Sequence, residues 1–581
     1  MVIAAALWAV SGARAWRTMI LPLAVAALFL FQLAPLPDAV LSMLAPVSVG
    51  RWKAAQEGLA SSWATISVDP GATASGIRRV VLALATIAAV ASLSRTPMFR
   101  RWFYTALAVS GLLVWVAAFV FPVDPNNRSV MGFFSLRGPI DFWKSPERGP
   151  LQTSGFCYLD WVTVGNVRYQ ADGPISGDGF GTYIYSNHYA NALCLTLPAA
   201  WALWMLYTRN RMPFPARFGV LLSGMALACW TTGGLAHSRA GTAALAFSAV
   251  VYLALVAQSR WLRWTAGGLA AAGTLGLAGF VAAVQGPLSG LLTVLPASLL
   301  ERITPLLSDA RIVAARVAGR MFLASPLLGT GLGTYGDLYA VLQRTDHTMY
   351  FAHNDYAQFL AEAGLLGVGI LGTVAWALGW RLWRVCRERA AANRLIDAGA
   401  WAALAGAAAH SFFDWNMHAP ANVVLACIVA GLAISSVTPI AGRQRASSIG
   451  WPAATIRVAF VLACLGVIPL LARDAFTADT LDELRRANTA ARVEALKPDA
   501  PSAQLLITVA IARGERARRF DPGNWQLAAM LGQANVHLAQ GAEDQTARQA
   551  RMDAAEQWFR RARQACAATR GYPEPLPAAA K

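Results

Sequence analysis

The sequence has little charge. Only 14% of its 581 residues are Asp, Glu, Lys or Arg, whereas 56% are hydrophobic. A soluble protein of this length needs a more charged surface, so the composition excludes that class and predicts an integral membrane protein. Basic residues outnumber acidic ones by 49 to 31, but most of them lie in short connections between apolar runs. This distribution is typical of membrane topology and argues against a nucleic-acid partner.

Three further absences narrow the class. The seven cysteines are not spaced in pairs, so the sequence predicts neither a zinc site nor a disulfide framework. The apolar run near the N-terminus lacks a small-residue cleavage site, so we expect it to be retained as a first membrane span. No internal repeat is visible, and repeats are typical of transporters.

Eleven apolar runs meet or approach the roughly 20 residues that a spanning helix needs. They cover residues 18–36, 77–94, 102–121, 188–207, 218–236, 240–257, 264–283, 356–380, 396–413, 419–438 and 453–472. The sequence therefore predicts an all-α, polytopic fold with about 11 transmembrane helices over residues 1–472.

The basic residues predict the orientation of these spans. With the N-terminus inside, six Arg-rich connections lie on the cytoplasmic side, as expected for cytoplasmic loops. Arg78 and Arg79 disagree, but they close a long loop, and long loops carry less weight. Three external stretches, 37–76, 122–187 and 284–355, are then too long to be simple turns, and loops of that length usually have a function.

Residues 473–581 have a soluble, helical composition and are expected on the outer side of the membrane. The run Asp521-Pro522-Gly523-Asn524, followed by Leu531-Gly532 and by Ala555, Phe559 and Ala562, resembles one tetratricopeptide unit. A plain helical hairpin fits the same residues. Such a domain suits contact with a protein partner.

Arginine side chains at the expected outer face are candidates for phosphate binding. Arg239 interrupts two apolar runs beside Ser238 and Gly241, whose small size lets a diphosphate approach closely. The Arg fork suits phosphate, although Arg239 could equally reach lipid headgroups. Arg311, Arg316 and Arg320 recur at roughly helical spacing, which fits either a solvated helix face or a binding site. Nearby, residues 329–333 form a Gly-rich run without a preceding strand, so we expect a tight turn beside the substrate and not a nucleotide fold.

A polar group precedes the eighth predicted span. His353 lies among Asn354 and Asp355 at the expected water interface, in the loop that holds the Arg cluster. It can act as a general base or serve only as a loop anchor. Glu362 lies within the apolar run, where an ionisable side chain is costly and normally has a partner or a role. We expect that partner to be an Arg.

These motifs together resemble the O-antigen ligase and polymerase superfamily. The residues that carry the resemblance are Ser238-Arg239, Arg311 upstream of Ser325-Pro-Leu-Leu-Gly-Thr-Gly-Leu-Gly333, His353-Asn-Asp-Tyr356 with Gln358, Glu362, Gly364 and Gly367, the run Tyr185-Ser-Asn187-His188-Tyr-Ala190, and His410 through Asp414 to Pro420. The resemblance covers about residues 35–440. Ala240 departs from it, because a Gly commonly follows the Arg in that family.

The resemblance implies a C-type glycosyltransferase fold in the bacterial inner membrane, with a glycan on undecaprenyl diphosphate as the donor. Arg239 and Arg311 would neutralise the leaving diphosphate, and His353 would take the acceptor proton. Asn187, His188, Arg316, Arg320, Asn354, Asp355, Glu362 and Asp414 would line the substrate site. No cofactor is expected. The external loops contain no Asp-x-Asp pair for a metal, which fits metal-independent, inverting transfer.

The acceptor stays open at this level. Lipid A core, a growing glycan chain in a polymerase, and a protein hydroxyl all fit the shared motifs. Outside the class, a transporter of lipid-linked glycans or a structural scaffold also matches many spans with few buried ionisable residues.

Overall fold

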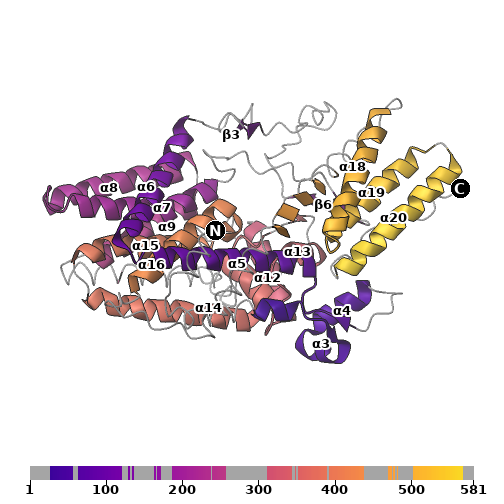
Figure 1. The fold of residues 1–581 in the computed structure, drawn as a ribbon, viewed down its shortest axis with the longest axis horizontal. Helices are drawn as coiled ribbons and strands as arrows, with labels where there is room; N and C mark the ends of the chain where they lie inside the picture. Colours follow the sequence, from indigo (N-terminus) through magenta and orange to yellow (C-terminus); the bar gives the residue numbers. More distant parts are fainter. Residues whose placement is uncertain are drawn as a thin grey trace, which may run out of the picture.

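The computed structural model describes residues 27–55, 63–120, 129–130, 134–135, 162–164, 167–171, 186–236, 238–256, 268, 310–342, 347–348, 351–388, 391–437, 501–542 and 544–566, with isolated positions between 469 and 488. Helices dominate this part of the chain (Figure 1). The strands are two to five residues long and form only small antiparallel or parallel pairs. The predicted all-α class is confirmed.

Six helical segments in the described residues are long and apolar enough to cross a membrane. They are α5 (Pro70–Leu93), α6 (Pro97–Val120), α7 (Ser186–Tyr207), α8 (Phe214–Trp230) with the following π-turn Thr231–Leu235, α9 (Arg239–Val256) and the first part of α14 (Asp355–Glu388). The chain is therefore a multi-pass membrane protein.

The predicted spans match these helices in part. Six of the eleven runs coincide with the six candidate spans. Run 396–413 falls on α15 (Ala391–His410), which is rich in alanine and is not among the six, and run 419–438 falls on α16 (Pro420–Val437), a shorter apolar helix. The runs 264–283 and 453–472 lie almost wholly outside the described residues, and run 18–36 is described only from residue 27 onward. The count of eleven stays a prediction.

Helix α15 is the centre of the membrane core. It packs against both α7 and α9, and α6, α8 and α16 contribute to the same apolar cluster. Glycines allow the close approach: a Cβ added at Gly399 would lie 2.8 Å from the Ala202 Cβ, and one at Gly406 would lie 2.7 Å from the Ser248 Cβ. Small residues at helix contacts are the usual means of tight packing where lipid removes the hydrophobic drive.

Helix α14 is broken at Gly364, whose φ of 65° and ψ of −170° are not helical. The segment before α13 (Tyr335–Leu342) lies along the break and satisfies its backbone. The carbonyl groups of Ala361 and Glu362 accept hydrogen bonds from the N–H groups of residues 330 and 331, while the N–H groups of residues 365 and 366 donate to carbonyls 326 and 327. A Cβ at Gly364 would lie 2.4 Å from the Leu327 carbonyl oxygen, so the break requires glycine there.

The long loops contain structure of their own. Stretch 37–76 holds α3 (Asp38–Leu44), α4 (Pro46–Ala55), the strand pair β1 (Leu36–Pro37) and β2 (Trp63–Ala64), and the start of α5. Stretches 122–187 and 284–355 meet through β6 (Val167–Ala171), which pairs with β5 (Val162–Val164) and also with β7 (His347–Thr348). A further short pair joins β3 (Ser129–Val130) to β4 (Phe134–Ser135). The second and third loops are thus connected five residues before His353.

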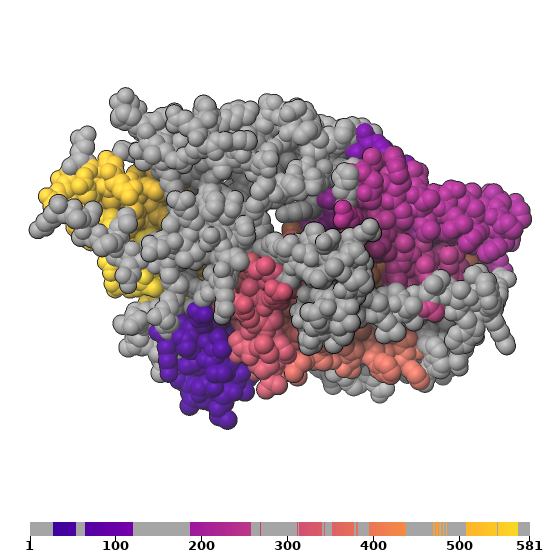
Figure 2. Space-filling view, turned by 180° about the vertical axis from the view of Figure 1, so that it is seen from behind, coloured from indigo at the N-terminus to yellow at the C-terminus, as the bar shows by residue number. Residues whose placement is uncertain are grey.

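The C-terminal region is helical where described. It consists of α18 (Pro501–Phe520), α19 (Trp525–Gln540) and α20 (Gln545–Ala565), with a separate apolar core. Asn524 caps α19 through its side-chain oxygen, and Gly532 packs against Phe559. These helices lie at one end of the molecule and α8 lies at the other (Figures 1 and 2). Their arrangement fits a helical hairpin domain, and the tetratricopeptide assignment stays a prediction.

Candidate active site

Five helix ends meet at one place: the starts of α7, α9, α14 and α16 and the end of α15. Asn187 accepts a hydrogen bond from the Ser238 hydroxyl at 2.6 Å, and the Asn422 amide donates to the His188 carbonyl at 3.1 Å. The Asp355 N–H donates to the Ser411 carbonyl at 2.9 Å. The charge pattern predicts the same side of the membrane for all five ends, so the structure and the predicted topology are consistent.

His353 and Asp414 form a hydrogen-bonded pair at this place. The distance from His353 Nδ1 to Asp414 Oδ1 is 3.2 Å, and the carboxyl group is buried. Within the described residues, no hydrogen bond is made to His353 Nε2. We call His353 and Asp414 the open pair, because the second ring nitrogen is available to a substrate.

The backbone of His353 is strained. Its φ is 48°, the left-handed region that residues with a Cβ avoid at a cost of about 1–2 kcal/mol. The preceding N–H, of Ala352, is fixed by Gln358 Oε1 at 3.1 Å, and the following residue, Asn354, caps α14 by accepting from the N–H groups of residues 356 and 357. The imidazole is thus held toward Asp414 by its neighbours on both sides.

The environment of Asp414 keeps it ionised. Burial raises the pKa of this carboxyl group, but the hydrogen bond to His353 and the charge of Arg311 outweigh burial and hold the pKa well below its ordinary value. Oδ1 also accepts from the Trp415 N–H at 2.9 Å. An ionised carboxylate on Nδ1 favours the tautomer with a proton on Nδ1, which leaves Nε2 as a proton acceptor.

A second pair, His418 and Asp355, lies next to the first. His418 Nδ1 is 3.2 Å from Asp355 Oδ1, and His418 Nε2 is 3.1 Å from Gln358 Nε2. We call His418 and Asp355 the closed pair, because both ring nitrogens have partners. Aromatic rings separate the two pairs: Phe351 stacks on Trp415 with centroids 4.3 Å apart and contacts the His418 ring at 4.6 Å.

His188 completes one wall of the site. Its ring meets the edge of Trp415 at 4.3 Å between centroids, and its own side chain is buried. His410 lies behind it, fully buried, with its Cε1 3.4 Å from the Cβ that a side chain at residue 241 would carry.

Two of the predicted arginines, Arg239 and Arg311, lie at helix starts. Arg239 is the first residue of α9 and is exposed, and Arg311 lies at the start of α12 (Ala310–Ala324), half-exposed and close enough for its charge to act on Asp414. Arg316 and Arg320, four residues apart, are both exposed, and Arg320 donates to the Leu342 carbonyl at 3.3 Å. Helix starts carry partial positive charge, so these positions suit an anion.

The carboxylate of Glu362 is used inside the protein. It accepts from the N–H groups of Gly333 at 2.7 Å and Tyr335 at 3.2 Å, and from Gln358 Nε2 at 3.0 Å. The donors are backbone and amide groups where we expected an Arg. These contacts occupy donors of the Gly-rich run, which therefore acts as a tight turn around the chain's own carboxylate.

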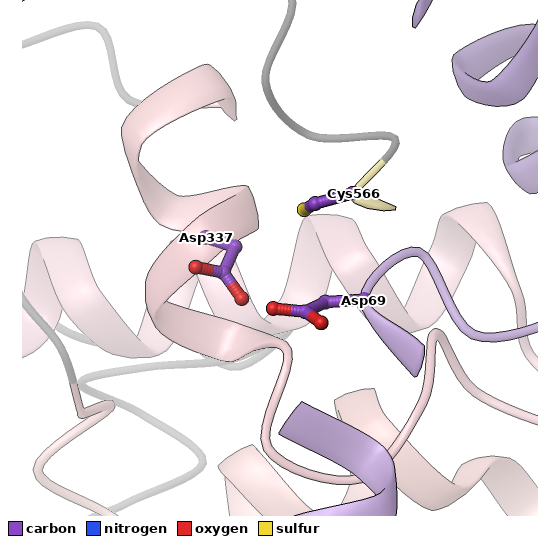
Figure 3. Close-up of side chains that lie close together, drawn as sticks. All are labelled: Asp69, Asp337 and Cys566. Carbon is purple, nitrogen blue, oxygen red and sulfur yellow. The ribbon is translucent and has the colours of Figure 1, made fainter. Parts of the chain in front are cut away.

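A separate cluster lies where the C-terminal helices meet the membrane core (Figure 3). Ligand atoms of Asp69, Asp337 and Cys566 all lie within 4.8 Å of one another, a grouping that could hold a metal ion. Burial raises the pKa of both carboxyl groups, and the charge of Asp69 raises that of Asp337 further. A hydrogen bond between them needs one proton, so the pair satisfies itself without a cation. Asp69 also accepts from Trp525 Nε1 at 2.7 Å.

Sequence reasoning did not single out His418 or Trp415 as site residues. His418 stands four residues after Asp414, and Asp355 stands two residues after His353. The available signal was that each of two distant segments carries one His and one Asp a few residues apart.

The chain was compared with known families and proteins. Residues 224–372 match the family model described as O-antigen ligase. The matched region contains Arg239, Arg311 and His353, and it ends before Asp414. Neither a curated protein nor a solved structure matches the chain.

Proposed function

We propose that this enzyme, whose residues 224–372 match the family model described as O-antigen ligase, transfers a glycan from undecaprenyl diphosphate to an acceptor hydroxyl at the outer face of the bacterial inner membrane. The observation that carries the proposal is the open pair: a histidine with a carboxylate on Nδ1 and an accessible Nε2, at the meeting point of several helix starts with an arginine in range.

The geometry supports a single displacement at the anomeric carbon. The acceptor oxygen forms a bond to that carbon, the bond to the diphosphate oxygen breaks, and the acceptor proton passes to His353 Nε2. Asp414 stabilises the resulting imidazolium, as a buried carboxylate on the opposite ring nitrogen does in other acid–base sites. One displacement inverts the anomeric configuration.

Arginine and helix dipoles would stabilise the leaving diphosphate. Arg239 and Arg311 provide planar donor forks, and the starts of α7, α9, α12 and α14 add partial positive charge. Charge placed in advance at a developing anion is usually the largest single contribution to such a reaction. Transfer by these groups needs no divalent metal, so we expect activity to survive chelation.

Asn187, His188, Asn354 and Asp355 would shape the site around the donor and acceptor. Lipid A core, a growing glycan and a protein hydroxyl are the candidate acceptors, and the C-terminal helices offer a surface for a protein partner. A broken helix such as α14 is also found in transporters, but the backbone groups at this break are hydrogen-bonded to residues 326–331.

The assay uses purified enzyme in nanodiscs with a synthetic undecaprenyl diphosphate sugar. Lipid A core, excess donor and a protein are offered as separate acceptors, with and without chelator. We expect the wild type to transfer the sugar to one of the acceptors. His353→Ala should bind the donor but transfer it about 10²–10⁴ times more slowly. Near wild-type rates for a folded His353→Ala would move the base elsewhere, with Asp355 and His188 tested next. Loss of transfer in chelator, restored by magnesium or manganese, would contradict metal independence.

The orientation has its own test. With the N-terminus inside, alkaline phosphatase fused after Lys581 should be active, because the C-terminal region would be periplasmic. A fluorescent reporter that is active at the same position, with an inactive phosphatase, would reverse the topology.

A further inference from the structure

We propose that His418 is a positioning residue that aligns the open pair through a reciprocal His–Asp arrangement; this inference rests on the proposed function. One segment supplies His353 and Asp355, and the other supplies Asp414 and His418. Each histidine bonds the aspartate of the opposite segment, at 3.2 Å in both pairs. Two crossed contacts fix both the separation and the rotation of the segments, which one contact cannot do.

The closed pair holds the turn that carries Asp414. The Asp355 N–H donates to the Ser411 carbonyl, and Asp355 Oδ2 accepts from the Met417 N–H at 3.1 Å. Asp355 Oδ1 is hydrogen-bonded to His418 Nδ1. Asp355 therefore secures the turn at both ends, and Asp414 stands between those ends. Displacing His418 releases one of these anchors.

The hydrogen bonds around Gln358 determine the tautomer of His418. The Ala352 N–H can only donate, so the Gln358 atom that receives it is Oε1. The amide nitrogen then faces both Glu362 and His418 Nε2. His418 Nε2 must accept that hydrogen bond, so the proton lies on Nδ1 and points at Asp355. His418 is neutral, with no nitrogen available for a substrate, which separates its role from that of His353.

The chain of contacts extends into the protein interior. Glu362 receives Gln358 on one side and the N–H groups of Gly333 and Tyr335 on the other. The buried carboxylate thus fixes the amide, the amide fixes the imidazole of His418, and that imidazole fixes Asp355. The position of Asp414 follows from a carboxylate that never meets the substrate.

The test compares three variants in the transfer assay. His418→Ala removes both contacts, and we expect kcat to fall by roughly 10–100-fold with the KM for the donor within about twofold of wild type. His418→Asn keeps an amide N–H close to the place of Nδ1, so it should recover most of the lost rate. His537→Asn makes the same change at a half-buried histidine of α19 and should match wild type.

The outcomes separate this inference from the proposed function. Absence of wild-type transfer to every acceptor contradicts the function. Full activity of a folded His353→Ala contradicts the assignment of the base, and with it the positioning role proposed here. Wild-type kcat for a folded His418→Ala, alongside an inactive His353→Ala, overturns the positioning role alone. Where His418→Ala does not fold, ¹⁵N spectra of the histidines give the second measurement. His418→Asn identifies the His418 signal by its loss; that signal should be of a neutral, Nδ1-protonated histidine and should change in Gln358→Ala, and an unchanged signal overturns the inference.

Discussion

The open pair and the closed pair contain the same two residue types at the same distance, 3.2 Å between Nδ1 and Oδ1. They differ in the second ring nitrogen. His418 Nε2 meets Gln358, whereas His353 Nε2 has no hydrogen-bond partner in the described part of the chain. The backbone differs as well, because only His353 has a positive φ among the described residues other than glycine.

This difference shows how the same chemical pair serves two purposes. A histidine whose two ring nitrogens are both hydrogen-bonded is held in one tautomer and fixes the positions of the residues it contacts. A histidine with one bonded nitrogen keeps a defined tautomer and can still accept a proton. Strain at His353 supports the same assignment, because unfavourable backbone conformations persist where the surrounding structure enforces them, often at functional sites.

The largest effect should come from breaking the open pair's charge. Asp414→Asn removes the carboxylate that supports the imidazolium, and its amide can turn His353 to the other tautomer, so kcat should fall by about 10²–10⁴. Asp355→Asn in the closed pair should cost only about tenfold. Steady-state kinetics of both variants, with matched unfolding temperatures as the control, check the ratio. Equal losses would show that the two pairs share one role.

A smaller effect should come from the arginines near the open pair. Arg239→Lys and Arg311→Lys keep the charge but lose the planar fork, so transfer should fall by roughly 10–100-fold. Arg548→Lys in the C-terminal hairpin serves as the control. Measured rates at equal expression decide the point: normal turnover in both site variants would mean that these side chains reach the lipid headgroups instead.

The smallest effect concerns acids with opposite pKa shifts. The pKa of Asp414 is lowered, so its contribution to stability is present above the ordinary value of about 4 and is lost as pH falls. The pKa values of Asp69 and Asp337 are raised. Their contribution to stability is therefore present at low pH, where both are protonated, and is lost as pH rises. Raising pH should therefore weaken the packing of the C-terminal helices, which contact Asp69 through Trp525 of α19.

This third prediction is measured by thermal unfolding and by proteolysis of the C-terminal helices at low and high pH. A decrease of roughly 2–4 °C at high pH, absent in Asp337→Asn, is expected. Asp553→Asn, on the exposed face of α20, is the control. A decrease of the same size in Asp337→Asn would place the pH effect at another group.

Hydropathy predicted the spans that the structure describes, because a bilayer selects long apolar helices almost regardless of their neighbours. The same sequence predicted His353, Asp355 and Asp414 as site residues but not their crossed pairing. The two contacts join residues 61 and 63 positions apart, and that register depends on how α14 and α15 pack. The prediction that an Arg would pair with Glu362 was wrong. Its partners include backbone N–H groups, which every residue except proline has and which a sequence pattern therefore cannot reveal.

The break at Gly364 has a consequence for biogenesis. Gly364 lies nine positions after Asp355, about 14 Å along the helix, so the interruption would lie near mid-depth of a hydrocarbon layer about 30 Å thick. Bare amide and carbonyl groups there are costly in lipid. Their partners, residues 326–331, precede α14 in the chain and are synthesised first. Inserting α14 without that segment would leave these groups bare in lipid, so we expect the two to enter the membrane together.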